Sequence, residues 1–131
     1  MASYHFHLTQ VKRSRGQSVI AQAAYRAGEK LYSTYYGESS DFTRKRGVVM
    51  AEICLPDHAP REYADRETLW NALEWAESGR KAQLAHSFDI TLMNEFSMEE
   101  NIEMARAFVQ EELVSRGMIA DFVIHDPVRL K

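Results

Sequence analysis

Four segments of the chain have the side-chain pattern of β-strands. Residues 4–9 and residues 86–92 alternate between apolar and polar side chains, which is typical of a strand with one buried face. Residues 47–55 and 119–125 are rich in apolar and β-branched side chains, a composition that also favours strands. We therefore expect a strand in each of these four ranges.

Three segments repeat apolar residues at the spacing of an α-helix. Residues 17–31 carry an apolar stripe that consists of Ile20, Ala23, Ala24, Ala27 and Leu31. A second helix is expected over residues 65–78, because it begins with a capping aspartate and is followed by glycine. A third is expected over residues 97–116, where a Ser-Met-Glu-Glu capping box precedes the apolar repeat and a glycine follows it.

The order of these elements narrows the fold class. Strands and helices alternate along the 131 residues, which on its own would allow a parallel sheet. The half-polar strand faces favour instead a single α+β domain, in which helices cover one face of an antiparallel sheet. The polar stretch 33–46, between the first helix and the second strand, is expected to be an irregular loop.

The composition is that of an ordinary globular protein. Hydrophobic residues make up 45% of the chain and charged residues 27%, and no apolar run approaches the ~20 residues of a membrane helix. The N-terminus lacks the apolar stretch of a signal peptide, so the cytoplasm is the expected location and no membrane partner is expected. The single cysteine, Cys54, excludes an intrachain disulfide and a cysteine metal cluster.

Positive charge is concentrated in two short groups, although the net charge is −3. These groups consist of Lys12, Arg13 and Arg15, and of Arg44, Lys45 and Arg46. A mildly acidic protein with two basic loops can still bind DNA locally. The alternative interpretation, which charge runs alone favour, is that both loops are simply solvated.

The polar faces of the expected strands carry groups that could bind a metal. His5 and His7 share one face of the first strand, Asp89 lies on the polar face of the third, and His125 ends the fourth. If these faces coincide, imidazoles and a carboxylate gather on the open side of the sheet and could bind a divalent metal. A strand histidine taken alone is more often a surface or hydrogen-bonded residue.

Tyr25 is an unusual residue on the first predicted helix. At ~100° per residue it lies far from the apolar stripe, and the side chains one turn away, Ala21 and Gly28, are small. Its hydroxyl is therefore expected to be accessible. The alternative is a tyrosine whose ring packs while its oxygen meets water, which is common.

Seven segments spread over nearly the whole chain carry a further signal. They are YH at 4–5, SRGQS at 14–18, AAYRAGEKL at 23–31, DFTRKRGVV at 41–49, LWNA at 69–72, SRGMIAD at 115–121 and IHDP at 124–127. Together they resemble the MobA/MobL plasmid-mobilisation relaxases of the MobQ type, whose fold is that of the HUH relaxases.

The resemblance implies an enzyme that nicks one DNA strand at a transfer origin. Tyr25 matches the family's nucleophile, which attacks the scissile phosphodiester to form a 5′-phosphotyrosyl link and a free 3′-hydroxyl. Asp89 matches an often acidic position and would support the metal or the tyrosine. Other mobilisation proteins are expected partners. Single-stranded DNA would contact Arg13, Arg15, Arg26, Arg44, Lys45 and Arg46.

The same resemblance implies a divalent metal, Mn or Mg, held by three histidines. The first matches His125, and the other two belong to an Asn-Pro-His-x-His motif that would follow Lys131. We therefore expect residues 1–131 to form a single, incomplete relaxase domain without its last strand and two of its metal ligands. The strand edge left exposed would favour homodimers.

A second hypothesis belongs to a different functional class. A relaxase fragment with a defective metal site would act only as a module that binds single-stranded DNA or dimerises. A third hypothesis is a nonfunctional remnant. The discriminating feature is the pair of histidines that would complete the site of His125.

Overall fold

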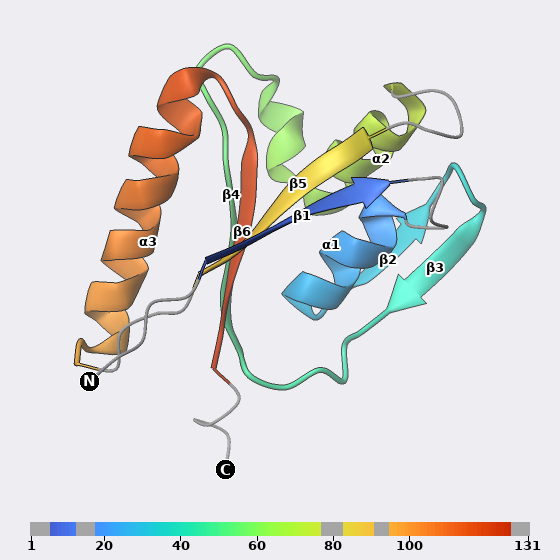
Figure 1. Ribbon diagram of the computed structural model, residues 1–131. Coiled ribbons are helices and arrows are strands. Elements are labelled where there is room, and N and C mark those ends of the chain that lie inside the picture. Colours follow the sequence, from blue (N-terminus) through green and yellow to red (C-terminus); the bar gives the residue numbers. More distant parts are fainter. Residues whose placement is uncertain (1–5, 13–17, 77–82, 91–94, 127–131) are drawn as a thin grey trace.

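The structure of the protein is a computed structural model that describes residues 6–12, 18–76, 83–90 and 95–126 (Figure 1). In chain order its elements are β1 (Phe6–Lys12), α1 (Val19–Ala27), β2 (Lys30–Ser33), β3 (Glu38–Asp41), β4 (Val48–Cys54), η2 (Arg61–Ala64), α2 (Arg66–Ala76), β5 (Gln83–Ile90), α3 (Met98–Glu112), η3 (Val114–Arg116) and β6 (Ala120–His125). The strands form three antiparallel pairs, β1–β5, β2–β3 and β4–β6. The predicted α+β class with antiparallel strands is confirmed.

Strands β1 and β5 come from the two alternating segments of the sequence. Their register places Phe6 opposite Ile90 and His7 opposite Asp89. Strand β5 begins at Gln83, earlier than predicted, and the predicted end at 91–92 lies outside the described residues. Alternation identified both strands because its period of two differs clearly from the helical period.

The β4–β6 pair has helices on both of its faces (Figure 1). Successive residues of a strand point to opposite faces. Phe122 packs against a cluster that contains Val109 of α3, whereas Asp121 accepts hydrogen bonds from Arg66 and Trp70 of α2. The predicted coverage of one face only is therefore corrected for this pair, because a polar strand residue is bonded to a helix rather than to water.

Helix α1 ends earlier than its apolar stripe. Ser18 caps its start by accepting a hydrogen bond of 3.3 Å from the Ala21 amide. Gly28 then adopts a left-handed φ of 67°, which ends the helix at Ala27 rather than at the predicted residue 31. Leu31 belongs to β2, although it packs in the same core cluster as α1. Its burial was predicted correctly and its helical state was not.

Strands β2 and β3 form a hairpin where the sequence predicted an irregular loop. Gly37 has a φ of 70° in the turn between them. The Glu67 carboxylate of α2 accepts a hydrogen bond from the Tyr32 amide. Asn71 of α2 bonds the Tyr32 carbonyl at 2.9 Å and the Thr34 amide at 3.0 Å. Most hairpin side chains are polar and exposed, so a search for apolar periodicity could not find it.

The predicted starts of the other two helices are confirmed. Asp65 caps α2 by accepting a hydrogen bond of 3.1 Å from a backbone amide, and Ser97 forms the predicted capping box with Glu100. The α-helical part of α3 ends at Glu112, and a 3₁₀ turn then continues to Arg116. Among the described helices, none combines the length and the apolar character needed to cross a membrane.

Candidate active site

Tyr25 lies near the end of α1, on the side away from the core. The residue is 53% exposed, whereas Ile20 and Ala24 of the same helix are fully buried. Its ring meets the ring of Phe42 edge to face, with centroids 5.3 Å apart and an interplanar angle of 86°. The predicted position off the apolar stripe is confirmed, and the ring is packed although much of the residue meets solvent.

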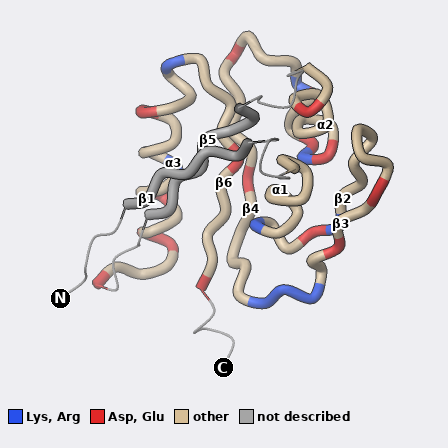
Figure 2. The backbone as a smooth tube through the Cα atoms, turned by 45° about the vertical axis from the view of Figure 1, so that its right-hand side comes forward, with Lys and Arg blue, Asp and Glu red and all other residues tan. Residues whose placement is uncertain are grey.

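A short loop of residues 42–47, which we call the basic loop, packs against Tyr25. It contains Arg44, Lys45 and Arg46, and Figure 2 shows this run as a continuous positive segment between β3 and β4. Lys45 Nζ lies 4.0 Å from the centroid of the Tyr25 ring and donates a hydrogen bond of 2.7 Å to the Tyr25 carbonyl. An ammonium over an aromatic face is attracted by the ring quadrupole. Positive charge is thereby fixed beside the candidate nucleophile.

Backbone hydrogen bonds define the shape of the basic loop. The Phe42 amide donates to the Glu29 carbonyl at 3.1 Å, and the Lys45 amide donates to the Phe42 carbonyl at 3.0 Å. Asp41, just before the loop, accepts from the Thr43 hydroxyl at 2.7 Å and from the Thr43 amide at 3.0 Å. These hydrogen bonds lower the pKa of the Asp41 carboxyl. The loop is therefore an ordered turn that is attached to the end of α1.

His125, the last residue of β6, is held by the same loop. Its Nε2 donates a hydrogen bond of 2.9 Å to the Arg46 carbonyl, and the Asp126 amide donates one of 2.7 Å to the Gly47 carbonyl. Arg46 directly follows Lys45 in the chain. Adjacent residues of the basic loop thus contact the candidate nucleophile and the candidate metal ligand, which are far apart in the sequence.

Gly28 allows α1 to approach the basic loop closely. A Cβ atom at this position would lie 3.3 Å from Cγ2 of Val48 and 3.7 Å from the Phe42 carbonyl oxygen. Its φ of 67° is also one that residues with a side chain rarely adopt. A larger residue would strain the backbone and crowd the contact between α1 and the loop.

The sequence that builds this site matches a known protein family. The model of the MobA/MobL family covers residues 17–130 of the chain. The chain belongs to the MobA/MobL family. Conjugal transfer protein TraA of Rhizobium radiobacter is 38% identical to it over 136 residues, which cover 96% of this chain and 12% of TraA. Probable mobilization protein MobA of Bifidobacterium longum is 33% identical over 126 residues, which cover 96% of this chain and 22% of that protein.

Two further MobA/MobL comparisons concern length and fold. Mobilization protein MobL of Acidithiobacillus ferridurans is 33% identical over 127 residues, and the match covers 97% of this chain and 33% of MobL. The chain therefore spans at most a third of the length of these three relatives. A solved structure described as "Molecular Basis of Vancomycin Resistance Transfer in Staphylococcus aureus" superposes with a TM-score of 0.91 at 35% identity, and the match covers 95% of this chain and 63% of that chain.

Three residues predicted to function in this MobA/MobL family member are not placed at the site. Arg13 and Arg15 lie outside the described residues. Asp89 is described by its backbone, which lies opposite His7 in the β1–β5 pair. The predicted support of a metal or of the tyrosine by Asp89 therefore stays a prediction.

The other predicted DNA-contacting residues gather around the end of α1 and the basic loop. Arg44 and Arg46 are exposed, whereas Lys45 is half-buried. Burial lowers the pKa of the Lys45 ammonium, and the nearby positive charge of Arg26 adds to this effect. Such clustered cations attract phosphate groups, so the site suits the DNA contacts that the MobA/MobL resemblance implies, which themselves stay predictions.

His125 has the hydrogen bonding of a metal ligand, but the described side chains do not complete a metal site. In a neutral imidazole, donation from Nε2 to a carbonyl leaves Nδ1 with the lone pair that a metal needs, and ligating histidines usually have such a second hydrogen bond. Within residues 18–76 and 95–126, no three histidine, cysteine, aspartate or glutamate side chains lie close enough to hold an ion. The expectation of Mn or Mg stays a prediction.

A buried ion-pair network, which the sequence patterns did not predict, connects to the site through Glu29. Arg66 donates to both carboxylate oxygens of Asp121 at 2.8 Å and to Glu29 at 3.1 Å. Trp70 Nε1 also donates to Asp121, at 2.8 Å. The network joins α2 and β6 to Glu29, the residue that follows Gly28 at the end of α1. A signal was available, because a basic residue in the first turn of a helix opposes the helix dipole and so needs an acidic partner.

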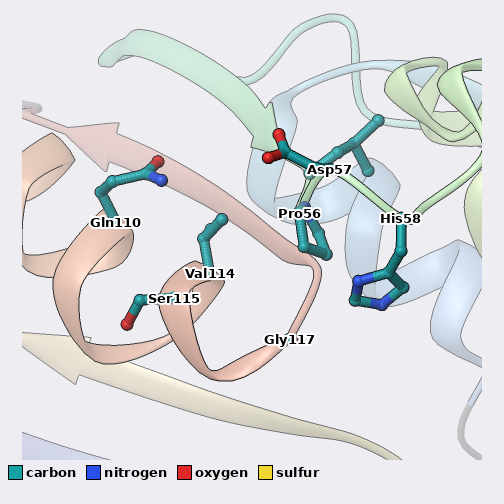
Figure 3. A pocket seen from close by; sticks show the side chains of 8 residues that line it. Pro56, Asp57, His58, Gln110, Val114, Ser115 and Gly117 are labelled. Carbon is teal, nitrogen blue, oxygen red and sulfur yellow. The ribbon is translucent and has the colours of Figure 1, made fainter.

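A cavity at the other end of the β4–β6 pair contains reactive residue types in a different arrangement. It has a volume of about 310 Å³, and its lining includes Asp57, His58 and Ser115. Figure 3 shows the Ser115 hydroxyl and the Asp57 carboxylate pointing away from the His58 ring. A nucleophile and its base must lie within hydrogen-bond reach, so these three side chains do not form such a site.

Proposed function

We propose that this chain carries the nucleophile of a relaxase that nicks one strand of plasmid DNA at a transfer origin. The phenolic oxygen of Tyr25 attacks the phosphorus of the scissile phosphodiester. A bond forms between phosphorus and the tyrosine oxygen, and the bond to the 3′ oxygen breaks. The phenol loses a proton, and the leaving 3′ oxygen takes one up. The products are a 5′-phosphotyrosyl strand and a free 3′-hydroxyl.

One observation carries this proposal: the basic loop contacts both Tyr25 and His125 through adjacent residues. It supports the proposal because the resemblance gives these two residues, far apart in sequence, the roles of nucleophile and metal ligand. The exposure of Tyr25 adds further support, since a scissile phosphate has to reach the phenol. The conjugal transfer and mobilization names of the relatives point to the same process.

The charge around Tyr25 suits attack on a phosphodiester. The backbone phosphates of DNA carry negative charge, and exposed cations attract them and hold the strand near the tyrosine. Arg44 and Arg46 are exposed beside the ring-bound Lys45. Because a phosphotyrosyl ester resembles the original diester in energy, the same site can later rejoin the strand without ATP.

A divalent metal, Mn or Mg, is part of this proposal. When bound, such an ion polarises the phosphate and stabilises the leaving oxygen. His125 is the proposed ligand on this chain, and Asp89 is its proposed support. Because the described residues do not complete the site, no step of the proposal is assigned to the metal.

Covalent capture on a denaturing gel tests the nucleophile. The chain is incubated with Mg²⁺ or Mn²⁺ and with 3′-labelled single-stranded oligonucleotides that tile the transfer region of its own plasmid. Tyr25→Phe should reduce the protein–DNA adduct by about 100-fold or more. Tyr32→Phe is the matched control, because Tyr32 on neighbouring β2 is also exposed, at 46%, and it should leave the adduct unchanged. An adduct that survives Tyr25→Phe would overturn the proposal.

A DNA-binding module without covalent chemistry is the second candidate function. It is favoured by the single candidate metal ligand that the described residues place beside an exposed basic loop. Its affinity for an oligonucleotide should fall with salt, with a logarithmic slope of about 0.7 for each phosphate contact. Replacement of Arg44 and Arg46 by glutamine should reduce that slope by about 1.4. Salt-dependent binding without any wild-type adduct would favour this candidate.

Self-association stays a proposal as well. Each described ladder has two strands, so within the described residues every strand has an outer edge where backbone groups could pair with a second chain. Sedimentation at raised protein concentration tests for a homodimer, and a monomer with an ordinary melting temperature would contradict it. Contacts with other mobilisation proteins and a location in the bacterial cytoplasm are likewise proposals.

A further inference from the structure

Lys45 makes two contacts with a single residue, Tyr25. Its Nζ donates to the Tyr25 carbonyl at 2.7 Å and also lies 4.0 Å from the ring centroid. That carbonyl belongs to the last turn of α1, where the Glu29 amide bonds to the Ala24 carbonyl at 3.0 Å. Carbonyls at a helix end need partners from outside the helix, and basic side chains can supply them. Lys45 therefore caps a backbone group and covers the ring of the same residue.

We propose that Lys45 is a positioning residue for Tyr25, an inference that rests on the proposed role of Tyr25 as the nucleophile. Lys45 holds the ring from its face, and Phe42 meets it edge to face. The Lys45 amide bonds to the Phe42 carbonyl at 3.0 Å, so these two residues form one clamp. The clamp restricts ring rotation before DNA binds. The entropy of orienting the nucleophile is then lost during folding rather than during the reaction.

The burial pattern of the basic loop separates Lys45 from its neighbours. Arg44 and Arg46 are exposed, whereas Lys45 is half-buried. Burial lowers the pKa of Lys45, with the charge of Arg26 contributing, while the carbonyl and ring contacts stabilise the charged form. The Lys45 ammonium is thus used within the protein, and the two arginines are the ones that face a phosphate. In this proposal Lys45 positions the tyrosine, whereas Arg44 and Arg46 contact the DNA strand.

Two methionine variants test this division. Lys45→Met removes the charge and keeps an unbranched side chain, and Arg44→Met is the matched control one position earlier. We would measure the affinity for the transfer-origin oligonucleotide and the rate of adduct formation at saturating DNA. Lys45→Met should lower the saturated rate by about tenfold to a hundredfold, because a small misplacement of the nucleophile has effects of this size, and should barely change affinity. Arg44→Met should weaken binding and leave the saturated rate unchanged.

A spectroscopic readout reports on the tyrosine ring itself. Incorporation of 3-fluorotyrosine labels the six tyrosines of the chain, and the Tyr25→Phe variant assigns the fluorine signal of Tyr25. The chemical shift of this signal should change in Lys45→Met and in Phe42→Leu, and should stay the same in Arg44→Met. Lys45→Arg is a second variant in case the methionine variant does not fold. It should keep most of the saturated rate, because a guanidinium also stacks on aromatic rings.

These readouts distinguish failure of the inference from failure of the proposed function. A wild-type adduct together with an unmoved Tyr25 signal in Lys45→Met would overturn the role of Lys45 alone. So would a Lys45→Met variant that, like Arg44→Met, loses affinity and keeps its saturated rate. If the wild type forms no adduct at Tyr25, the nucleophile itself is overturned, whatever the fluorine signal does. A moved signal with a slowed adduct supports the inference.

Discussion

The two ends of the β4–β6 pair carry similar residue types and differ in how these residues are connected. At one end, His125 is bonded to the basic loop, which also clamps Tyr25. At the other end, Asp57, His58 and Ser115 line one cavity and point apart (Figure 3). Reactive side chains that happen to be neighbours do not make a site. A shared loop, whose backbone fixes their relative positions, is what distinguishes the Tyr25 end.

The largest expected effect comes from breaking the ion-pair network in which Arg66 of α2 joins Asp121 of β6 to Glu29, close to the end of α1. Asp121→Ala leaves Arg66 without its main partner, and the Arg66 side chain is only 9% exposed. The buried guanidinium then keeps only the more exposed Glu29 as a partner, so the variant should lower the free energy of unfolding by about 3 kcal/mol. Glu52→Ala is the matched control, because it breaks the more exposed pair with Arg106 and should cost at most about 1 kcal/mol. Urea unfolding measures the free energy of unfolding of both variants. Equal losses would show that the buried network stabilises the protein no more than the exposed ion pair does.

A smaller effect on the free energy of unfolding is expected when a side chain is added at Gly28, where α1 approaches the basic loop and the start of β4. Gly28→Ala and Gly37→Ala both place a side chain at a left-handed φ, 67° and 70° respectively. Each should cost about 1–2 kcal/mol of unfolding free energy for that conformation. Gly28→Ala should cost about 1 kcal/mol more, because its Cβ would lie 3.3 Å from Val48, while no described atom lies within 4 Å of the Gly37 position. Identical losses in thermal unfolding would show that close packing at Gly28 is unimportant.

The smallest expected effects on the free energy of unfolding come from replacing one histidine at each end of the β4–β6 pair. His125→Ala removes the hydrogen bond to the Arg46 carbonyl and should cost about 0.5–1 kcal/mol of unfolding free energy. His58→Ala alters an exposed cavity residue and should change stability by less than about 0.5 kcal/mol. Urea unfolding of both variants checks the difference. A larger loss at His58 would reverse the comparison of the two ends.

Those parts of the fold that depend on local patterns were predictable from the sequence. The capping box at Ser97 and the cap at Asp65 act on amides within one turn, so short motifs revealed them. The β2–β3 hairpin was missed because it depends on Asn71 of a distant helix and presents polar side chains. The end of α1 was misplaced because Leu31 continues the apolar period beyond Gly28 while belonging to a strand.

The exposed position of Tyr25 was predictable from the sequence, whereas its contacts were not. Helical periodicity placed Tyr25 off the core, which the structure confirms. Phe42 and Lys45 lie outside helices and strands, so no periodicity connects them to Tyr25, and their contacts arise only when the chain folds. The side-chain roles proposed for Asp89 rest on the resemblance alone.

The basic loop is attached to the rest of the protein at both of its ends. These attachments constrain the number of residues in the loop, but they do not constrain its exposed side chains. Phe42 and Lys45 contact Tyr25, and the carbonyls of Arg46 and Gly47 accept hydrogen bonds from His125 and Asp126. The exposed side chains of Arg44 and Arg46 take no part in these attachments through their guanidinium groups. An insertion or deletion would detach one end, whereas a point substitution at either arginine would not. We therefore expect the relatives to vary in sequence at the two arginine positions while the length of this loop stays constant.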